Sequence, residues 1–548
     1  MFPMLNSRLG HYLILALVGT ILCFFNLGTP SLWDIDEGNN AEAAREMLES
    51  ENWTIPTFNY QLRVDKPALL YWLQIGAYRL FGINEFAARF PSATAALLTL
   101  LLTYELARRM FGKNTGLLAG IILASSPAFC AAAHFANPDA LLNACTVLTF
   151  LIFWIGMKAG RGWWYVSLGV GTGLAMLAKG PVGLILPGSA AGLYLLSSGR
   201  LKPFCKKEIV WSFLAFAMVA FPWYILVSVD TKISFLRGFI MTHNVGRFLN
   251  TMENHRGPIF YYPIVLAAGF AIWSVFLGQA IWFASGSRAR SDVITTEDSQ
   301  YRYLWCWIAV YFVFFSVSST KLPNYILPIY APIAIMIGRF LERWRSGAIQ
   351  PPRWMAHVSM ATLLLIGIGL GGGLLVAAGV IDIARFRGRE LPGLGGWAIL
   401  GSVPIVAATA GWMWLRARSL TGLIYTFAAA AVLLAIGITA GSSTAVDWYK
   451  APKALVLDSE TRQSDQEIRI GCYEYFQPSL VFYCRREIQR LENEKKTIDF
   501  LNGPLPSYLF LPATVWDGLE AKLENPHTLL ARHYDLYRHC EVVVVSNR

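Results

Sequence analysis

The stretch HYLILALVGTILCFFNLG, residues 11–28, is almost entirely apolar, and the acidic segment WDIDEG, residues 33–38, follows it closely. A helix of about 20 apolar residues spans the roughly 30 Å hydrocarbon core of a membrane. The stretch has this length and lacks the small-residue cleavage site of a signal peptide. We therefore expect a retained first transmembrane helix that leads into a charged segment at one membrane surface.

Comparable apolar stretches recur as far as about residue 441. Hydrophobic residues make up 55% of the 548-residue chain and charged residues only 15%, whereas soluble domains carry about 25% charged residues. This composition predicts a mainly α-helical, polytopic membrane protein. We expect about thirteen spans, at residues 11–28, 90–108, 115–133, 138–157, 163–178, 180–198, 209–228, 260–283, 303–318, 324–341, 356–379, 395–415 and 421–441.

The net charge of +11 comes mostly from short loops, so it indicates topology rather than nucleic-acid binding. The basic loops share the side of the N-terminus, which places the N-terminus in the cytoplasm and the C-terminal tail in the periplasm of a bacterial inner membrane. Arg385, Arg387 and Arg389 are the exception. The cytoplasmic residues would be Arg108, Arg109, Lys113, Lys158, Arg161, Arg200, Lys202, Lys206, Lys207, Arg288, Arg290, Arg339, Arg343, Arg345, Arg353, Arg416 and Arg418.

Two domains are expected: a transmembrane domain over residues 1–441, and a small soluble α/β periplasmic domain over residues 442–548. The tail has strand-like runs at 468–475, 507–511 and 541–545, helical patterns near 485–501 and 514–524, and no catalytic constellation. An oxidising periplasm would allow a disulfide between Cys472 and Cys484, although the odd third thiol, Cys540, argues against it.

The transmembrane domain has two long outer loops, at about 29–89 and 229–259. Short helices are expected in the first loop at 41–48 and 68–73. Asp34, Asp36 and Glu37 are three carboxylates beside an apolar interface, which is unfavourable unless they are hydrated, paired or metal-bound. Asp36 is therefore either a catalytic or metal-binding carboxylate, or an acidic residue in a solvated helix start.

Several outer lysines suggest a cationic rim that suits phosphate. Lys66 precedes Pro67, which would hold its ammonium near a helix N-terminus, a site that favours anions. An interfacial lysine that extends to water is the alternative. Lys179 and Lys321 stand alone in outer turns, where positive charge is otherwise rare, and the second long loop adds His243, Arg247 and Arg256.

Asp139 ends the outer turn Asn137-Pro138-Asp139. Asp139 either stabilises the turn and caps the helix that follows, or is a second carboxylate that shares a cleft with Asp36. The chain has no P-loop and no Rossmann fingerprint, so no nucleotide cofactor is expected. Charged residues within the spans are scarce, which argues against a proton-coupled relay.

Taken together, several segments resemble the GT-C membrane glycosyltransferases, and among them the 4-amino-4-deoxy-L-arabinose lipid A transferase family, which is related to protein O-mannosyltransferases. The resemblance covers about residues 10–340. It rests on WDIDEGNNAEAARE (33–46), WTIP (53–56), DKP (65–67), YW (71–72), NPD (137–139), AKGP (178–181), RGP (256–258), YY (261–262) and KLPNY (321–325).

The resemblance implies transfer of a sugar from a polyprenyl-phosphate carrier to lipid A or a similar acceptor at the outer face, among membrane lipids and without nucleic acid. Asp36 and Asp139 match the catalytic carboxylates. Lys66 matches the residue that holds the carrier phosphate, and Asp65 and His243 are the candidates if a divalent metal is used. The other implied substrate contacts are Glu37, Lys179, Arg247, Arg256, Lys321 and Tyr325.

The chain departs from its relatives at two points of this pattern. Asn39-Asn40 stand where many relatives have Arg-Tyr, and Asp65 stands where lipid A-modifying relatives often have Glu. These changes leave the reaction type intact and leave the sugar and the acceptor open. The alternatives are a lipid-linked-sugar transporter or flippase, a GT-C enzyme with a protein or other glycan acceptor, and a non-catalytic scaffold.

Overall fold

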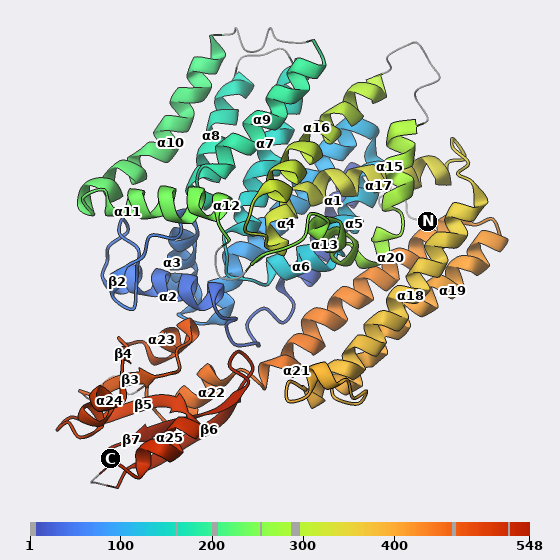
Figure 1. Ribbon diagram of the computed structural model, residues 1–548. Coiled ribbons are helices and arrows are strands. Elements are labelled where there is room, and N and C mark those ends of the chain that lie inside the picture. The colour runs from blue at the N-terminus through green and yellow to red at the C-terminus, as the bar shows by residue number, and fades with distance from the viewer. Residues whose placement is uncertain are drawn as a thin grey trace.

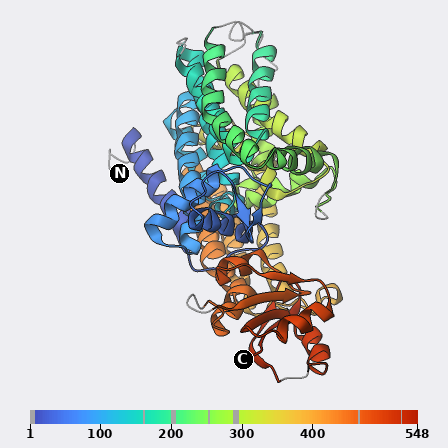
Figure 2. The ribbon, with the colours of Figure 1, turned by 90° about the vertical axis from the view of Figure 1, so that its left-hand side faces the viewer.

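The computed structural model describes residues 7–159, 163–199, 207–251, 255–286, 296–462, 467–523 and 526–548. Figure 1 shows a large helical unit and a smaller C-terminal unit that contains a sheet. We use the name C-terminal unit for residues 443–548, from α21 onward. Figure 2 places this C-terminal unit at one end of the helices. The loop residues Arg161, Arg200, Lys202, Lys206, Arg288 and Arg290 lie outside the described residues, and the orientation in the membrane stays a prediction.

The first part of the chain alternates membrane-type helices with the outer segment that carries the acidic motif. The Ser7 hydroxyl caps its first helix by accepting the N–H of Gly10 at 3.0 Å. Both helices predicted in the outer segment are confirmed, and both are longer than expected. The elements are α1 (Arg8–Phe24), α2 (Asp36–Glu49), β1 (Thr57–Phe58), β2 (Gln61–Leu62), α3 (Leu69–Phe81) and α4 (Glu85–Phe111).

The next helices surround the outer turns at Asp139 and Lys179. The first two, at the predicted span 115–133, are bent by 68°. Ser126 is extended before Pro127, which lacks an N–H and restricts the residue before it, so one straight helix cannot continue through this point. These helices are α5 (Lys113–Ala124), α6 (Pro127–Ala133), α7 (Asp139–Ala159), α8 (Trp163–Lys179), α9 (Val182–Ser197) and α10 (Glu208–Asp230).

The second long outer segment is helical over much of its described length. It contains α11 (Ser234–Arg237), the π-helix η3 (Gly238–Gly246) and α12 (Arg247–Leu249). The helices that follow are α13 (Tyr261–Gly269), α14 (Ala271–Ser274), α15 (Leu277–Gly286), α16 (Thr296–Val317), η4 (Pro323–Ile329), α17 (Tyr330–Arg345), α18 (Arg353–Ala377), η5 (Ala384–Phe386), η6 (Pro392–Gly401), α19 (Ser402–Arg416), α20 (Leu420–Gly437), η7 (Ile438–Ser442) and α21 (Ser443–Asp447).

Among the described residues, seven helices are long and apolar enough to cross a membrane, or eight if the bent pair α5–α6 counts as one span. Others fall short for local reasons. α1 and α9 have 17 and 16 residues, and the predicted span 260–283 is broken into α13, α14 and α15. The protein is thus a multi-pass, mainly helical chain, while the count of thirteen spans stays a prediction.

One large apolar core joins the helices of the first unit. Its centre is aromatic: the Phe150 and Trp307 rings stack with centroids 3.8 Å apart, and the Phe270 and Tyr330 rings stack at 4.4 Å. Buried aromatic side chains contribute large contact areas, and stacked pairs add roughly 0.5–1.5 kcal/mol each. This core fixes α6, α7, α16 and α17 relative to one another, and the outer turns between them carry the polar site.

The C-terminal unit is a five-stranded mixed sheet in the order β4-β3-β5-β7-β6. The strand-like runs at 468–475, 507–511 and 541–545 coincide with β3, β5 and β7, whereas β4 and β6 were not predicted. The elements are α22 (Ala451–Asp458), β3 (Arg469–Tyr473), α23 (Pro478–Cys484), β4 (Gln489–Leu491), α24 (Glu494–Leu501), β5 (Ser507–Pro512), α25 (Ala513–Glu520), β6 (Thr528–Asp535) and β7 (Cys540–Ser546).

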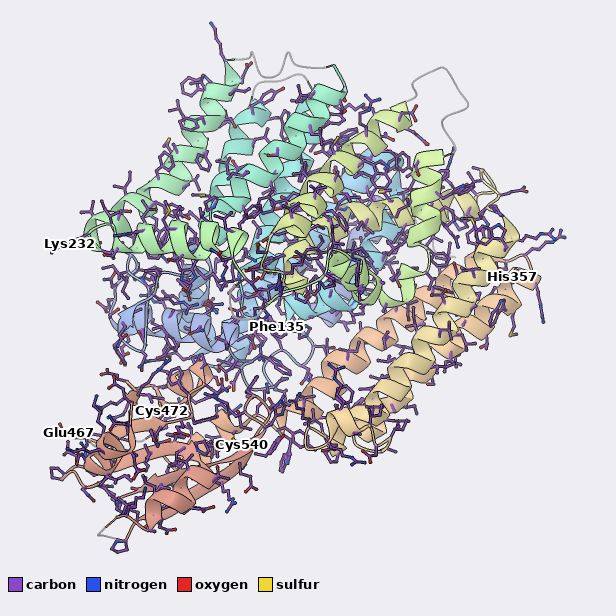
Figure 3. All side chains as sticks on the ribbon, in the orientation of Figure 1. Phe135, Lys232, His357, Glu467, Cys472 and Cys540 are labelled. Atoms are coloured by element: carbon purple, nitrogen blue, oxygen red, sulfur yellow. The ribbon has the colours of Figure 1, made fainter. Side chains whose placement is uncertain are left out.

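The cysteines of the C-terminal unit are free thiols. Cys472 and Cys484 are both free and buried, and the disulfide considered for this pair is not formed. Cys540, the third thiol, lies apart from Cys472 within the unit, as Figure 3 shows. The unit is therefore held together by its sheet and its apolar clusters, without a covalent link among the described cysteines.

Candidate active site

A cavity of about 940 Å³ lies where the helical unit meets the C-terminal unit. Asp36 and Lys66 of the first outer segment line it, together with Arg247 of the second. Phe135, which lines the same cavity, lies at this level of the molecule in Figure 3. The C-terminal unit supplies Phe476, Gln477, Pro478, Arg490, Tyr537 and Arg538. Segments far apart in the sequence thus enclose one cavity, with charged side chains on an otherwise largely apolar wall.

A buried ion pair fixes the loop between α1 and α2. Arg89 of α4 and Glu37 have side chains that are 2% and 0% exposed, and the guanidinium binds both carboxylate oxygens at 2.9 and 2.8 Å. Arg89 also donates to the carbonyls of Leu27, Pro30 and Ser31 at 2.7–2.9 Å. All five N–H groups of this arginine are therefore used to hold the loop.

Glu37 has a different role from the predicted substrate contact. Its carboxylate also accepts the backbone N–H groups of Trp33 at 2.8 Å and of Ala136 at 2.6 Å. Because the side chain is fully buried and bonded on every side, it does not face the cavity. Buried carboxylates need such partners, and here they make Glu37 a clamp between the acidic loop and the turn before Asp139.

The C-terminal unit holds the same loop from the other side. The Asp447 carboxylate accepts the N–H and the hydroxyl of Ser31 at 2.8 and 2.6 Å. Lys450 donates to the Ser31 carbonyl at 2.7 Å, and its ammonium lies 4.1 Å from the centroid of the Trp33 ring. The Tyr483 hydroxyl accepts the N–H of Leu32 at 2.8 Å. The acidic motif is therefore positioned by both units.

Asp34 joins the two units directly. Its carboxylate accepts the backbone N–H of Ser479 at 2.7 Å and the Ser479 hydroxyl, and its own N–H donates to the Tyr537 hydroxyl at 3.0 Å. Burial raises the pKa of Asp34 to about 7, although the hydrogen bonds from Ser479 act in the opposite direction. This carboxyl therefore titrates near neutral pH at the contact between the units.

Asp36 is the first residue of α2 and lines the large cavity. The preceding Ile35 gives no side-chain cap, and the helix dipole favours an acidic group in this first turn. Asp36 is exposed, and its carboxylate forms no hydrogen bond or ion pair with another residue of the described ranges. It is thus the carboxylate of the acidic motif that is left available to a bound molecule.

Lys66 and Arg247 form a cationic wall opposite this carboxylate. Both line the large cavity and also a smaller one of about 90 Å³. Burial lowers the pKa of Lys66, and so do the nearby charges of Lys179 and Arg247, whereas Asp36 raises it. Within the described residues the Lys66 ammonium has no hydrogen-bond partner, so its charge is left available to an anion.

Four phenylalanines line the smaller cavity beside its cations: Phe239, Phe248, Phe314 and Phe315. Lys179 lines it too, with its ammonium 4.9 Å from the centroid of the Tyr325 ring, and the Tyr325 hydroxyl accepts a 3.3 Å hydrogen bond from Arg247. This cavity therefore joins a charged end to an apolar, aromatic wall.

Asp139 lines neither the large cavity, where Asp36 lies, nor the smaller one. Its carboxylate is 5% exposed, pairs with the Lys179 ammonium, and accepts a 2.6 Å hydrogen bond from the Asn324 amide. These contacts show that it holds Lys179 and the Asn324 turn in place. The catalytic role predicted for Asp139 stays a prediction.

Asp65 and His243 are close together, with a 2.8 Å contact between a carboxylate oxygen and Nε2. Arg63 lies 3.1 Å from the same carboxylate, and within the described ranges no group of three or more His, Cys, Asp or Glu residues is placed to hold a metal. Burial favours a higher pKa, yet the His243 and Arg63 contacts hold the pKa of Asp65 well below its usual range. These residues fit an ion-pair network better than a metal site.

Two predicted substrate contacts lie away from the cavity walls. Lys321 is buried, and its ammonium donates to the Ser318 carbonyl at 2.6 Å. Arg256 is exposed and contributes to neither cavity. Of the predicted contacts, Lys66, Lys179, Arg247 and Tyr325 are brought together.

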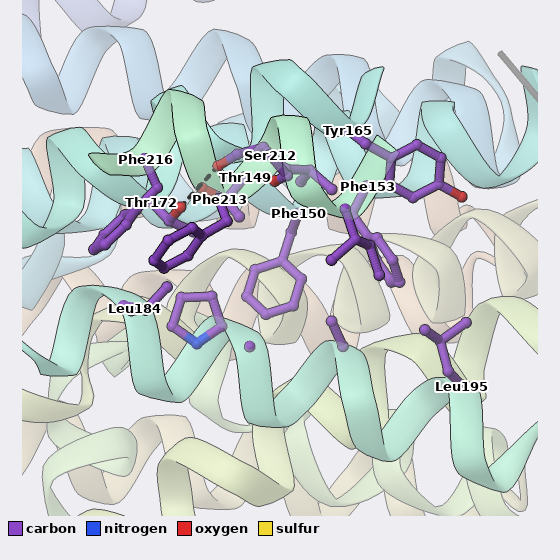
Figure 4. A pocket seen from close by; sticks show the side chains of 15 residues that line it. Thr149, Phe150, Phe153, Tyr165, Thr172, Leu184, Leu195, Ser212, Phe213 and Phe216 are labelled. Carbon is purple, nitrogen blue, oxygen red and sulfur yellow. Dashed lines mark hydrogen bonds between the residues drawn. The ribbon is translucent and has the colours of Figure 1, made fainter. Parts of the chain in front are cut away.

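A further cavity of about 280 Å³ lies between α7, α8, α9 and α10. Figure 4 shows its aromatic and aliphatic lining, which includes Phe150, Phe213 and Phe216 and carries no charged side chain. It therefore lacks the means to bind a phosphate or to catalyse a transfer, and the polar cavities remain the candidate active site.

The family model described as dolichyl-phosphate-mannose-protein mannosyltransferase matches residues 65–225, the part that contains Lys66, Asp139 and Lys179. An uncharacterized protein of Aquifex aeolicus is 30% identical over 331 residues, which cover 60% of this chain and 73% of that protein. The chain belongs to the GT-C membrane glycosyltransferases. The GT-C assignment makes it an enzyme that transfers a sugar.

Two other comparisons agree with this GT-C assignment. The undecaprenyl phosphate-alpha-4-amino-4-deoxy-L-arabinose arabinosyl transferase of Edwardsiella ictaluri is 27% identical over 427 residues, or 75% of each chain. The crystal structure of ArnT from Cupriavidus metallidurans bound to undecaprenyl phosphate superposes with a TM-score of 0.82 at 22% identity, covering 99% of both chains. The second likeness shows that the whole chain, C-terminal unit included, shares that fold.

The GT-C site also contains residues that the sequence did not reveal. Arg89 lies one position before a predicted span and was not distinguished from a membrane-boundary arginine. Lys450, Arg490 and Arg538 belong to the tail, in which no catalytic constellation was recognised. The signal that could have pointed to Arg89 was its position beside an apolar span, where a charged residue needs a buried partner.

Proposed function

We propose that the chain transfers 4-amino-4-deoxy-L-arabinose, or a related sugar, from a polyprenyl-phosphate carrier to lipid A or a similar acceptor at the periplasmic face of the inner membrane. The observation that carries the proposal is the Asp36 carboxylate, which shares one cavity with the Lys66 ammonium and with Arg247; among the described residues, neither the Asp36 carboxylate nor the Lys66 ammonium has a hydrogen-bond partner. The names of the Edwardsiella and Cupriavidus relatives support the identity of the carrier and of the sugar.

The smaller cavity suits the donor. Lys66, Lys179 and Arg247 offer three cationic groups to a phosphate, and the four phenylalanines offer an apolar surface to the isoprenoid chain attached to it. Since Lys66 and Arg247 line both cavities, the phosphate would lie at their junction, and the sugar would extend into the large cavity beside Asp36.

The transfer step follows from this placement. An acceptor oxygen forms a bond to the anomeric carbon of the sugar, and the bond from that carbon to the carrier phosphate breaks, so that its electron pair leaves with the polyprenyl phosphate. Lys66 and Arg247 stabilise the charge that grows on this leaving group. If the acceptor is a hydroxyl, Asp36 takes its proton; a phosphate acceptor has none to lose, and Asp36 then stabilises positive charge on the sugar.

The test is the variant Asp36→Asn in proteoliposomes supplied with a radiolabelled undecaprenyl-phosphate sugar and lipid A. We expect transfer to fall by a factor of about 10²–10⁴ if Asp36 is a general base, and of about 10²–10³ if it stabilises charge in the transition state, with normal membrane insertion. The matched control is Asp382→Asn, which changes an exposed carboxylate paired with Arg387 and should leave transfer unchanged. Normal transfer by Asp36→Asn would refute the role of this residue.

The same assay separates the alternatives. A flippase or transporter would move the intact labelled lipid across the bilayer without releasing its sugar. A GT-C enzyme with another acceptor would release label only when a protein or other glycan replaces lipid A. Mass spectrometry of lipid A from cells with and without the gene then identifies the product in vivo.

A further inference from the structure

The C-terminal unit places two arginines on the wall of the large cavity. Arg490 lies on β4, the edge strand of the sheet, and Arg538 lies in the turn between β6 and β7. These segments are separated in the sequence, and the fold of the sheet brings both to the cavity that Asp36 lines. The tail therefore carries charge to the site as well as positioning its loop.

Neither guanidinium is neutralised. The Arg490 guanidinium carbon lies 3.4 Å from the centroid of the Phe476 ring, a contact that orients the group without compensating its charge. Arg538 donates its backbone N–H to Asp535 at 3.1 Å. Within the described ranges, the side chains of Arg490 and Arg538 form no hydrogen bond or ion pair with a carboxylate.

The more buried arginines of the chain differ from these two. Arg89 and Arg45 each bind both oxygens of a carboxylate. Arg63 lies 3.1 Å from the Asp65 carboxylate. A planar guanidinium that faces a cavity with free N–H groups is suited to bidentate contact with a phosphate or carboxylate. Arg490 and Arg538 are therefore suited to bind an anion.

The cavity has two separate sets of cations. Lys66 and Arg247 lie on the helical unit at the junction with the smaller cavity, where the proposed donor phosphate binds. Arg490 and Arg538 lie on the C-terminal unit and do not line the smaller cavity. One phosphate on the donor accounts for the first set and leaves the second set without a ligand.

We propose that Arg490 and Arg538 bind phosphate groups of the acceptor, so that the C-terminal unit selects acceptors that carry anionic groups. This inference rests on the proposed transfer reaction. It assigns the two faces of the cavity to the two substrates: the helical unit binds the anionic end of the donor, and the C-terminal unit binds the anionic end of the acceptor.

The test uses full-length Arg490→Gln, Arg538→Gln and the double variant, with initial rates measured against both substrates. Loss of one charge-assisted contact is expected to raise the acceptor KM about 10-fold, and loss of both about 100-fold. The donor KM and the rate at saturating acceptor should stay unchanged. Arg532→Gln is the matched control, because this arginine of the same unit pairs with Glu541 and does not line the cavity.

Two acceptors separate the sources of the anion. Wild-type protein should prefer lipid A with two phosphates to lipid A from which one phosphate has been removed, which keeps a phosphate able to accept the sugar, and the double variant should lose that preference. The proposal would be overturned if the acceptor KM of the double variant, and its preference between the two forms of lipid A, both stayed within twofold of wild type. A rise in the donor KM instead would overturn it too, because the arginines would then bind the carrier phosphate.

A binding measurement makes this result independent of catalysis. Thermal stabilisation of the detergent-solubilised protein by phosphorylated lipid A is expected in wild type and in Asp36→Asn, and is expected to be absent in the double variant. If wild type transfers no sugar but shows this stabilisation, the proposed function fails while the anion site stands. If the double variant is stabilised like wild type, the anion site fails.

Discussion

The Arg89–Glu37 pair offers a sharp test of how the acidic loop is held. Replacing Arg89 by Met removes five hydrogen bonds, two of them to a carboxylate, and leaves the charge of Glu37 buried without its cation. Removing one partner of a buried ion pair typically lowers the free energy of unfolding by about 3–5 kcal/mol. We expect Arg89→Met to lose stability of this size.

The second half of the test is a double-mutant cycle. Because the main cost of Arg89→Met is an uncompensated charge, adding Glu37→Gln should restore part of the lost stability. Arg89→Lys should be intermediate, since an ammonium has three N–H donors and cannot bind the carboxylate with the planar fork of arginine. The control is Arg387→Met, which breaks the exposed pair with Asp382 and should leave stability unchanged.

The assay is thermal unfolding of the detergent-solubilised protein, read by intrinsic tryptophan fluorescence, with transfer activity measured in parallel. Arg89→Met should lower the unfolding midpoint and the activity together, because Asp36 directly precedes Glu37 in the chain. An unfolding midpoint of Arg89→Met equal to that of wild type would show that the Arg89–Glu37 pair does not stabilise the acidic loop. A double variant less stable than Arg89→Met would show the same.

Two further predictions concern pH and the donor. Burial raises the pKa of Asp34 to about 7, above its unfolded pKa of about 3.9. The protonated carboxyl therefore stabilises the fold by about 4 kcal/mol at most, fully below about pH 3.9, and this contribution is lost as pH rises through 7. Asp34→Asn should flatten this part of the profile of unfolding midpoint against pH, and an unchanged slope would contradict the assignment. Lys66→Met should raise the donor KM by roughly 10- to 100-fold, the effect of one charge-assisted phosphate contact, whereas the exposed Lys232→Met should leave it unchanged.

The helices could be predicted from the sequence because each apolar stretch is long enough to be recognised without reference to the rest of the chain. The runs of the tail that became β3, β5 and β7 are apolar and largely buried, and they were visible for the same reason. β4 was missed because it is a three-residue edge strand with two exposed positions, and β6 because exposed and buried residues mix along it. The weak elements depend on their neighbours rather than on their own residues.

In the candidate site, too, features set by neighbouring residues could be predicted, whereas features set by distant residues could not. Asp36 and Lys66 were predicted because each stands in a motif that is read within a few residues. The contacts of Asp139 were not predicted, because its partners Lys179 and Asn324 are 40 and 185 residues away. A carboxylate that is free and one that holds a lysine look the same in a sequence, and only the packing of α7 against its neighbours distinguishes them.

The hydrogen bonds of residues 31–34 show why the C-terminal unit belongs to the active site. The N–H groups of Ser31, Leu32 and Asp34 all donate to side chains of that unit, at 2.8–3.0 Å. Buried backbone donors that lose their partners destabilise the conformation that buries them. Without this unit the loop would lose those three bonds and keep only its contacts with Arg89, Glu37 and the helical core. The position of Asp36 therefore depends on residues more than 400 positions further along the chain, and a glycosyltransferase built in this way has its catalytic loop and its proposed acceptor site governed by the same small domain.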